Sequence, residues 1–318
     1  SLVYAERAEA LNELSAGENL LGGVYYSQNL WSSALQHTTR AMVLREQLGY
    51  TWGVAASLSN LGILAQLAGQ WSKAWSFFER SLALRQEIGD TEGVANAHNN
   101  LGTLARDQGK LDLARHHLRA SLEIAIPFQL GVYVIHANLG LAQVLLWEGD
   151  LDAARRAFAT SMHEAQALGA MDALAELLLF EAQILAAEGA PAQALGYAVR
   201  SAQLAAKIGI RTLEASAWRV AAEIELQSGD LEAAGQALCK AQEILGTVTD
   251  ELLSGRTVAL AGRIASEAGQ HTQAEQDLRH AQEVFTRLGA SRDLAQVQEA
   301  LRRVPRRDAT EVLRELSG

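Results

Sequence analysis

The chain has 318 residues, 49% of them hydrophobic, and a formal net charge of −10. This charge argues against a surface built for duplex nucleic acid, because phosphate contacts depend on clustered Lys and Arg. No run of about 18 apolar residues is free of charge, and the N-terminus lacks the basic and apolar regions of a signal peptide. We therefore expect a cytoplasmic protein with no membrane segment and no direct nucleic-acid contact.

One small repeat runs along the whole chain. Glycine recurs at an interval of 40 residues, at Gly69, Gly109, Gly149, Gly189, Gly229 and Gly269. Alanine stands five positions after each of them, from Ala74 to Ala274. Asn29 occupies the same position near the start, and asparagine is the other residue that tolerates a left-handed backbone. A fixed period of this length indicates a solenoid, here of about seven repeats.

Each repeat has the pattern of a helix hairpin. In residues 90–129, Asp90 can cap a first helix whose apolar residues fall on one face, and that helix ends at Gly109. A second helix begins near Leu111 and stops around Pro127, which cannot continue a helix. The chain is therefore predicted to be all-α.

Small residues recur where the two helices of a hairpin should approach closely. They occupy Gly22, Gly62, Gly102, Ala142, Ala182, Ala222 and Gly262, each 12 positions before the alanine of the repeat. A bulkier position follows that alanine, as in Phe78 and Leu118, and a second small position holds Ala41, Ser81, Ser121, Ser161, Ser201, Ala241 and Ala281. A larger side chain at the small positions is expected to overpack the contact by roughly 1–3 kcal/mol.

Both ends of the chain depart from the repeat. Residues 1–4 align with residues 81–84, inside a second helix, so we expect a fragment that begins within a repeat. Residues 291–304 form half a repeat with a polar face, which a terminal cap requires. We predict one solenoid over residues 1–304 that ends in this cap. Residues 305–318 are predicted to be a tail, or a short helix opened by Asp308 and Glu311.

This order of small, alanine, bulky and small positions resembles the tetratricopeptide repeat over nearly the whole chain. It departs from the standard 34-residue form in its length and in lacking the closing proline. Long repeats with the phrase Asn100-Leu101-Gly102 are similar to those of Pins/LGN-type adaptors and of the sensor arms of bacterial MalT- and AfsR-like regulators. The resemblance implies a right-handed α-α superhelix whose concave face, lined by first helices, binds a protein or peptide.

Residue types that carry chemistry occur without the necessary spacing. Cys239 is the only cysteine and is expected to be a small buried hydrophobe. His116 and His117 are adjacent on a predicted helix and are expected to be solvated. Trp31 and Trp71 share one position of the repeat and are expected to pack, and the basic run from Arg302 on is expected to be a solvated tail. We expect no metal, no cofactor and no enzymatic activity, because the strict spacing leaves no inserted loop for a catalytic site.

The polar residues are distributed unevenly. All eight asparagines precede residue 150. Side-chain amides both donate and accept hydrogen bonds, so a ladder of them can bind the backbone of an extended peptide. By resemblance, Asn60 and Asn100 hold the position that does this in related repeats. The predicted partner-binding residues are Asn19, Tyr26, Asn60, Asn96, Asn99, Asn100, Thr103, Arg106, His136 and Gln143. The alternative is that the asparagines satisfy local backbone groups.

These observations predict a non-enzymatic binding module, the sensor or partner-binding arm of a larger bacterial signalling or transcription regulator. We expect the partner, a protein or peptide, to bind in the concave groove. Other domains of the same full-length protein are one option for this partner. Two alternatives stay open: a free-standing scaffold or adaptor, and a small-molecule effector sensor with a closed pocket in place of an open groove. The oligomeric state is left open.

Overall fold

The computed structural model describes residues 2–28 and 30–305, with side chains from Arg7 on. Fifteen α-helices and no strands form this part of the chain, so the all-α prediction is confirmed. The turn expected at Asn29 and the short helix expected at Asp308 lie outside the described residues. Contacts group the described residues into unit 1, which runs to Leu177 and includes Thr247–Asp250, and unit 2, which holds the remainder.

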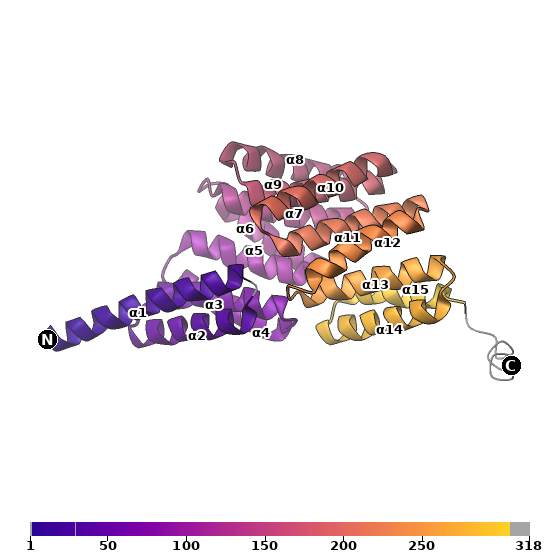
Figure 1. The fold of residues 1–318 in the computed structure, drawn as a ribbon. Coiled ribbons are helices and arrows are strands. Elements are labelled where there is room, and N and C mark those ends of the chain that lie inside the picture. Colours follow the sequence, from indigo (N-terminus) through magenta and orange to yellow (C-terminus); the bar gives the residue numbers. More distant parts are fainter. Residues whose placement is uncertain (1, 29, 306–318) are drawn as a thin grey trace, which may run out of the picture. The chain divides into compact units, whose positions relative to one another are not determined.

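Unit 1 alternates first and second helices in the order of the predicted hairpins (Figure 1). Its first helices are α1 (Leu2–Ser27), α3 (Thr51–Leu67), α5 (Thr91–Asp107) and α7 (Gly131–Glu148). Its second helices are α2 (Trp31–Gln47), α4 (Trp71–Glu87), α6 (Leu111–Ala125) and α8 (Leu151–Leu168). Each first helix packs on the second helix that follows it, and α5 also contacts α3 and α7. The first helices therefore lie side by side from α3 to α7.

Unit 2 has the same alternation. The helix α9 (Met171–Ala187) contains the residue at which the two units divide. It is followed by α10 (Pro191–Ile208), α11 (Arg211–Ser228), α12 (Leu231–Leu245), α13 (Glu251–Glu267), α14 (His271–Leu288) and α15 (Ser291–Arg303). Here α13 contacts both α11 and α15, so these three helices also lie side by side.

The repeating glycines end first helices in a left-handed backbone. All six have φ between 70° and 85°, a region in which a side chain costs roughly 1–2 kcal/mol. Gln129 has φ 55° and is the only residue other than glycine with a positive φ among the described residues. It occupies the position held by Gly89 one repeat earlier, and α6 ends at Ala125 just before Pro127. The turn therefore keeps its shape although the glycine is missing.

The small positions lie where two helices meet, as the spacing predicts. A Cβ added at Gly102 would lie 2.7 Å from Cγ of Leu118 and 3.2 Å from its backbone nitrogen. At Gly262 it would lie 2.8 Å from Cγ of Leu278 and 3.1 Å from the carbonyl oxygen of Ala274. The alanine positions are fully buried beside them, as Ala114 shows. The predicted close approach of helix backbones is confirmed.

Serines of the second small position make one hydrogen bond that repeats in unit 1. The Oγ atoms of Ser81, Ser121 and Ser161 are buried on second helices. Each donates to a carbonyl oxygen 26 residues earlier on the first helix, at distances of 2.8, 2.9 and 3.0 Å. The acceptors are the carbonyls of Ala55, Ala95 and Ile135. A polar group thus sits in the hairpin contact without losing its hydrogen bond.

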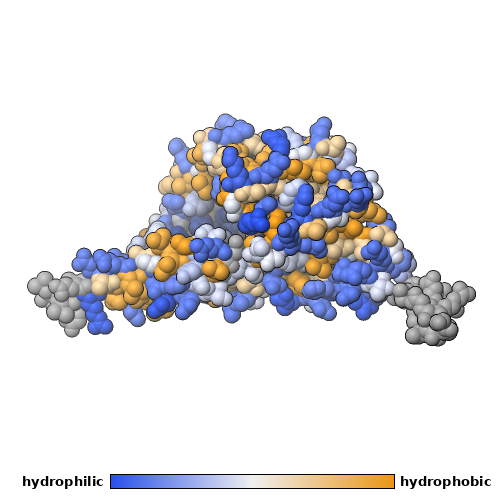
Figure 2. All heavy atoms as spheres, viewed as in Figure 1, coloured by the Kyte–Doolittle hydropathy of each residue, from blue (hydrophilic) through white to orange (hydrophobic). Residues whose placement is uncertain are grey.

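The first helix does not break where a repeat boundary was expected. By alignment with residues 81–84, the chain should leave one helix near Glu9 and start another, yet α1 runs without interruption from Leu2 to Ser27. Glu9 stands where Gly49 and Gly89 turn the chain in later repeats, so nothing stops the helix there. Half of the exposed large hydrophobic side chains of the described residues, including Leu20 and Leu35, lie between residues 14 and 43, and Figure 2 shows hydrophobic side chains over α1 and α2.

Two arginines are buried between hairpins at equivalent positions. Arg45 donates from Nη1 to the carbonyl oxygen of Gly53 at 3.1 Å and to Oγ of Ser57 at 2.8 Å. Arg85 pairs with Asp90 at 2.8 Å between Nη1 and Oδ2, and its side chain is 7% exposed. Asp90 also accepts at 3.0 Å from the backbone nitrogen of Gly93, so the predicted cap of α5 is confirmed. In later repeats Ala125 and Ala165 replace the arginine.

Two expectations about single side chains were wrong. Cys239 is exposed, because it follows the buried Leu238 on α12 and so points about 100° away from it. His116 is exposed, but its neighbour His117 is half-buried and packs edge-on to Trp75 at 6.0 Å between ring centres. Among the described residues no helix meets the length and hydropathy needed to cross a membrane.

His117 is expected to make stability depend on pH. Its Nδ1 lies 3.0 Å from Nδ1 of His98, and burial, then His98 and His116, lowers the pKa of His117 from 6.5 to about 4. As pH falls, the unfolded chain takes up this proton first, so stability should decline between pH ~6.5 and pH ~4. Urea denaturation across this range should show a shallower decline in His117→Gln. Equal declines would show that the histidine pair is not responsible.

Candidate functional site

A stripe of polar side chains runs along α5 on the face turned away from the hydrophobic core. Its residues are Glu92, Asn96, Asn99, Asn100, Thr103 and Arg106. Apart from the adjacent Asn99 and Asn100, they are spaced three or four apart, which places them on one side of the helix. The opposite side holds Leu101, Leu104 and Ala105, which are buried. We call the stripe, together with its neighbours on α3, α7 and the first half of α9, the first-helix face of unit 1.

Hydrogen bonds between helices hold the edges of this face. Gln66 on α3 donates from Nε2 to Oδ2 of Asp107 at 2.8 Å. Arg106 donates from Nη2 to Oδ1 of the same carboxylate at 2.8 Å. Tyr133 on α7 donates to Oε1 of Glu92 at 3.2 Å, and burial with Glu92 raises the pKa of this phenol to about 12. These contacts fix α3, α5 and α7 relative to one another before any ligand is bound.

The asparagines between these contacts retain unused hydrogen-bonding groups. Asn100 donates from Nδ2 to Oδ1 of Asn96 at 3.3 Å, which leaves its own carbonyl oxygen outside that bond. The Oδ1 atom of Asn99 is buried and has no hydrogen-bond partner within the described chain. Asn60, one repeat earlier on α3, is exposed. Adjacent first helices therefore carry amides whose hydrogen-bonding groups are not all paired.

The stripe continues onto α7 and α9. His136 and Gln143 are half-buried on α7, at the positions that Asn96 and Thr103 hold on α5. The next residue in this series is Glu176 on α9, which the sequence argument missed. Burial raises the pKa of Glu176, while His136 and Arg106 act in the opposite direction. Its place in the 40-residue series after Asn96 and His136 is the sequence signal that could have identified it.

Asn19 and Tyr26 stand apart from the other predicted binding residues. Oδ1 of Asn19 on α1 accepts at 3.2 Å from Nη1 of the buried Arg45. Tyr26 packs edge-on to Trp31 at 5.3 Å between ring centres. The structure thus brings together the predicted residues of α3, α5 and α7, whereas the two from α1 contact residues of their own hairpin.

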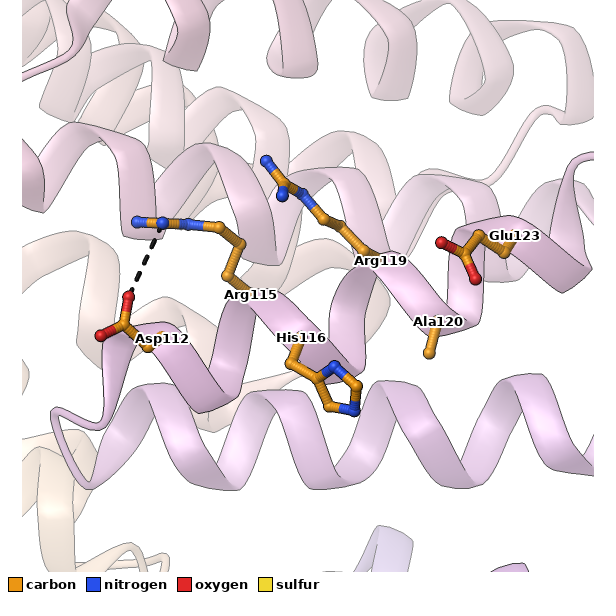
Figure 3. A pocket seen from close by; sticks show the side chains of 6 residues that line it. All are labelled: Asp112, Arg115, His116, Arg119, Ala120 and Glu123. Carbon is orange, nitrogen blue, oxygen red and sulfur yellow. Dashed lines mark ion pairs between the residues drawn. The ribbon is translucent and has the colours of Figure 1, made fainter.

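A shallow depression of about 290 Å³ lies along α6. Figure 3 shows the side chains that line it, all from this one helix: Asp112, Arg115, His116, Arg119, Ala120 and Glu123. Nη1 of Arg115 lies 3.7 Å from Oδ1 of Asp112. A site with walls from a single helix does not enclose a ligand, so this depression is unlike the closed pocket that a small-molecule sensor needs.

The tetratricopeptide repeat family model matches two overlapping segments, residues 8–87 and 53–126. The matched region therefore contains α2 to α6 and the amides of α3 and α5. No curated protein matches the chain significantly in sequence. The resemblance to this family is confirmed over these residues. For the later repeats, the likeness to known proteins is one of fold.

Solved structures extend the likeness along the chain. The apo form of RapI aligns with a TM-score of 0.63 at 16% identity, over 74% of this chain and 84% of that one. The Rap conjugation gene regulator of the plasmid pLS20, solved in complex with the Phr* peptide, gives 0.64 at 16% identity, over 89% and 75%.

A STAND protein with a tetratricopeptide repeat sensor, from Pyrococcus horikoshii, gives a TM-score of 0.57 at 13% identity, over 86% of this chain. This chain spans 42% of that protein's length. At these identities the likeness shows a shared fold. The chain has a helical-repeat fold of the tetratricopeptide type, and residues 8–126 match the family model.

Proposed function

We propose that the first-helix face of unit 1 binds an extended peptide segment of a protein partner. The observation that carries this proposal is the set of amides on adjacent helices, Asn60 on α3 with Asn99 and Asn100 on α5, whose hydrogen-bonding groups are not used up inside the protein. A peptide backbone offers alternating donors and acceptors, and amides can bond to both. Recognition of this kind depends little on the peptide's side chains.

Two features of the face favour a peptide over a substrate that is chemically transformed. The cross-helix bonds of Asp107 and Glu92 hold the helices in place, which lowers the entropy cost of binding. The same carboxylates are occupied by Gln66, Arg106 and Tyr133, so they are not available as general bases. We therefore propose a binding module without enzymatic activity. The Rap regulator solved with a bound Phr* peptide has the same fold, which supports this reading.

We further propose that the chain is the sensor or partner-binding arm of a larger bacterial signalling or transcription regulator. The STAND protein supports this context, because a tetratricopeptide repeat sensor forms part of a longer protein there. The test is the sequence of the gene upstream of Ser1. An ATPase or DNA-binding domain there would support the regulator, whereas a start codon close to Ser1 with neither domain would favour a free-standing adaptor.

The binding proposal predicts that Asn60→Ala combined with Asn100→Ala weakens peptide binding by about 5- to 150-fold. Each lost hydrogen bond to a bound backbone should cost about 0.5–1.5 kcal/mol, and the two costs add. The free energy of unfolding should change little, because Asn60 is exposed and Asn100 half-buried. The measurement is isothermal titration with dodecapeptides selected by wild-type protein from a random display library.

The matched control removes two amides from second helices of the same unit, Gln36→Ala on α2 with Gln86→Ala on α4, both exposed. This variant should bind the selected peptides like wild type. If the asparagine pair also binds like wild type, or if it loses several kcal/mol of stability, those residues are structural and the proposal fails. The proposal also fails if wild-type protein selects no peptide at all.

A further inference from the structure

Exposed apolar side chains gather at the turns that lead from one hairpin of unit 1 to the next. Among the described residues after Val43, every exposed large hydrophobic side chain lies at one of these turns or within two residues of it. These side chains are Tyr50, Trp52, Ile88, Ile126, Phe128, Val132, Leu168 and Met171. Apolar residues scattered singly over a surface need no explanation, but apolar residues that form a continuous patch mark an interaction site.

Contacts between the last three of these turns make their apolar side chains neighbours. Tyr133, just after the α6–α7 turn, donates to Oε1 of Glu92, just after the α4–α5 turn, at 3.2 Å. A Cβ added at Gly131 would lie 2.9 Å from Cδ1 of Leu168, so the α8–α9 turn lies against the start of α7. We call the exposed apolar residues of these three turns the apolar edge: Ile88, Ile126, Phe128, Val132, Leu168 and Met171.

The α6–α7 turn carries the two most exposed residues of the apolar edge. Ile126 is 60% exposed and Phe128 is 62% exposed. Pro127 between them has a fixed φ, and Gln129 after them donates from its backbone nitrogen to the carbonyl oxygen of Ile126 at 3.1 Å. A constrained turn therefore holds both side chains in solvent. The repeat does not require this exposure, because Leu288, four repeats after Phe128, is buried.

The charged residues of these turns are all acidic. Residues 86–93, 126–133 and 166–173 contain no Lys, Arg or His. Their charged residues are Glu87, Asp90, Glu92 and Asp172. Glu87 and Asp172 are exposed, and the whole chain has a net charge of −10. This field attracts a basic partner and repels anionic lipid headgroups. Two-fold pairing of the apolar edge with a second copy would bring like charges together, which is costly.

The spacing of the turns favours a helical ligand. Packed helices lie about 8–10 Å apart, and the first helices α5 and α7 contact each other, so the turns before them recur at about this distance. Residues seven apart in an α-helix share one side and lie about 10.5 Å apart. In an extended chain, side chains on one face recur at about 6.6 and 13 Å. A helix therefore matches the turns better than a strand does.

We propose that the apolar edge binds a basic amphipathic helix of a protein partner. Ile126 and Phe128 are the central contacts for its apolar side, and Glu87 and Asp172 pair with Lys or Arg at the border of that side. The apolar edge lies at the turns that precede first helices, whereas the peptide site proposed above uses amides along α3 and α5. The two proposals therefore stand or fall separately.

Selection from a display library of random 21-residue peptides tests the proposal with the full chain as bait. Some peptides should bind wild type but not the variant Ile126→Ser with Phe128→Ser. These peptides should have apolar residues at intervals of three, four and seven, together with an excess of Lys and Arg. Isothermal titration of one such peptide should show binding about 30-fold weaker or worse in the variant, the loss typical of an interface hot spot.

Charge reversal tests the acidic border of the apolar edge. The variant Glu87→Lys with Asp172→Lys should weaken binding of the same peptide by about 2- to 30-fold, the range for two exposed ion pairs. The difference from wild type should shrink at 1 M NaCl, where charges are screened over about 3 Å. An unchanged affinity at low salt would show that the partner is not selected by charge and would overturn this part of the proposal.

Two control variants should bind the selected peptide like wild type. Leu20→Ser with Leu35→Ser removes exposed apolar side chains from α1 and α2, so it tests for non-specific hydrophobic binding. Asn60→Ala with Asn100→Ala removes the proposed peptide contacts on first helices. Weaker binding in the leucine variant would overturn the assignment to the apolar edge. Weaker binding in the asparagine variant would assign the peptide to the first-helix face instead.

The serine variant should fold, because both of its side chains are exposed and such substitutions change stability little. If circular dichroism shows otherwise, Ile88→Ser with Met171→Ser gives the same test. The proposal is overturned if no peptide distinguishes wild type from the variant. It is also overturned if wild type alone forms a dimer by light scattering, which would assign the apolar edge to a second copy. Co-sedimentation of wild type alone with phosphatidylcholine–phosphatidylserine vesicles would assign it to a membrane surface.

Discussion

Replacing Asp90 with alanine should lower the free energy of unfolding by about 3–5 kcal/mol, the typical cost of removing one partner from a buried ion pair. Asp90 is the carboxylate partner of Arg85, whose side chain is 7% exposed. Ser81 and Ser59 accept from Arg85 at 3.2 and 3.5 Å, but a hydroxyl does not neutralise the charge. The loss of the α5 cap adds about 1 kcal/mol. Urea denaturation monitored by circular dichroism measures the change.

Asp150 and Asp230 provide controls for the cap alone. Each caps a second helix, with Oδ1 at 3.0 Å from the nitrogen of Ala153 and 2.9 Å from that of Ala233. Their alanine variants should lose only about 1 kcal/mol. The double variant Arg85→Met with Asp90→Ala should recover much of the lost stability, because no buried charge remains. If Asp90→Ala costs no more than Asp150→Ala, the Arg85 pair contributes nothing measurable.

Gly102→Leu should destabilise the protein by at least roughly 1–3 kcal/mol. Even a Cβ at this position would lie 2.7 Å from Cγ of Leu118 and 3.2 Å from the Leu118 backbone nitrogen. A rotation of the Leu118 side chain would relieve only the first of these contacts. The second involves the backbone of α6, which cannot move away without disrupting the packing of that helix. The free energy of unfolding from urea titration gives the result.

Gly196 on α10 is the opposite case, because a Cβ there would meet nothing within 4 Å. Gly196→Ala should raise the free energy of unfolding by about 1 kcal/mol, the difference in helix propensity between the two residues. Opposite signs at Gly102 and Gly196 would show that close helix contact, and not glycine as such, decides the effect. A Gly102→Leu protein as stable as wild type would mean that the two helices separate easily.

The sequence predicted the features that depend on neighbours within one hairpin. Gly102 and Leu118 are 16 positions apart, and the same contact recurs between Gly62 and Phe78 and between Gly262 and Leu278, so spacing alone indicated it. The cap at Asp90 was predictable for the same reason, since this cap spans only the four consecutive residues from Asp90 to Gly93. The same local pattern occurs in successive repeats, so the order of helix hairpins in an all-α chain could be predicted from the sequence.

Features that depend on a particular pair of helices were not foreseen. His117 is half-buried because it meets His98 and Trp75 on two other helices, and nothing in the adjacent histidine pair indicates this. The exposure of Cys239 could have been inferred from the repeat, because the same position holds the charged residues Glu79 and Arg119 in earlier repeats. The expectation of burial rested on residue type alone. The candidate site was only partly indicated, because the bonds that hold Asp107 and Glu92 join helices of successive repeats.

The serines of the hairpin contacts also fix how the two helices of a hairpin are aligned along their axes. Smooth alanine surfaces allow one helix to slide along another at little cost, since each small shift exchanges similar contacts. A hydroxyl bonded to one particular carbonyl, as in Ser121 with Ala95 at 2.9 Å, permits only one axial alignment, because any slide leaves the buried hydroxyl unpaired. Ser81 and Ser161 impose the same alignment on the hairpins before and after. The buried serines thereby hold the first helix at the same axial position relative to the second helix in three successive hairpins.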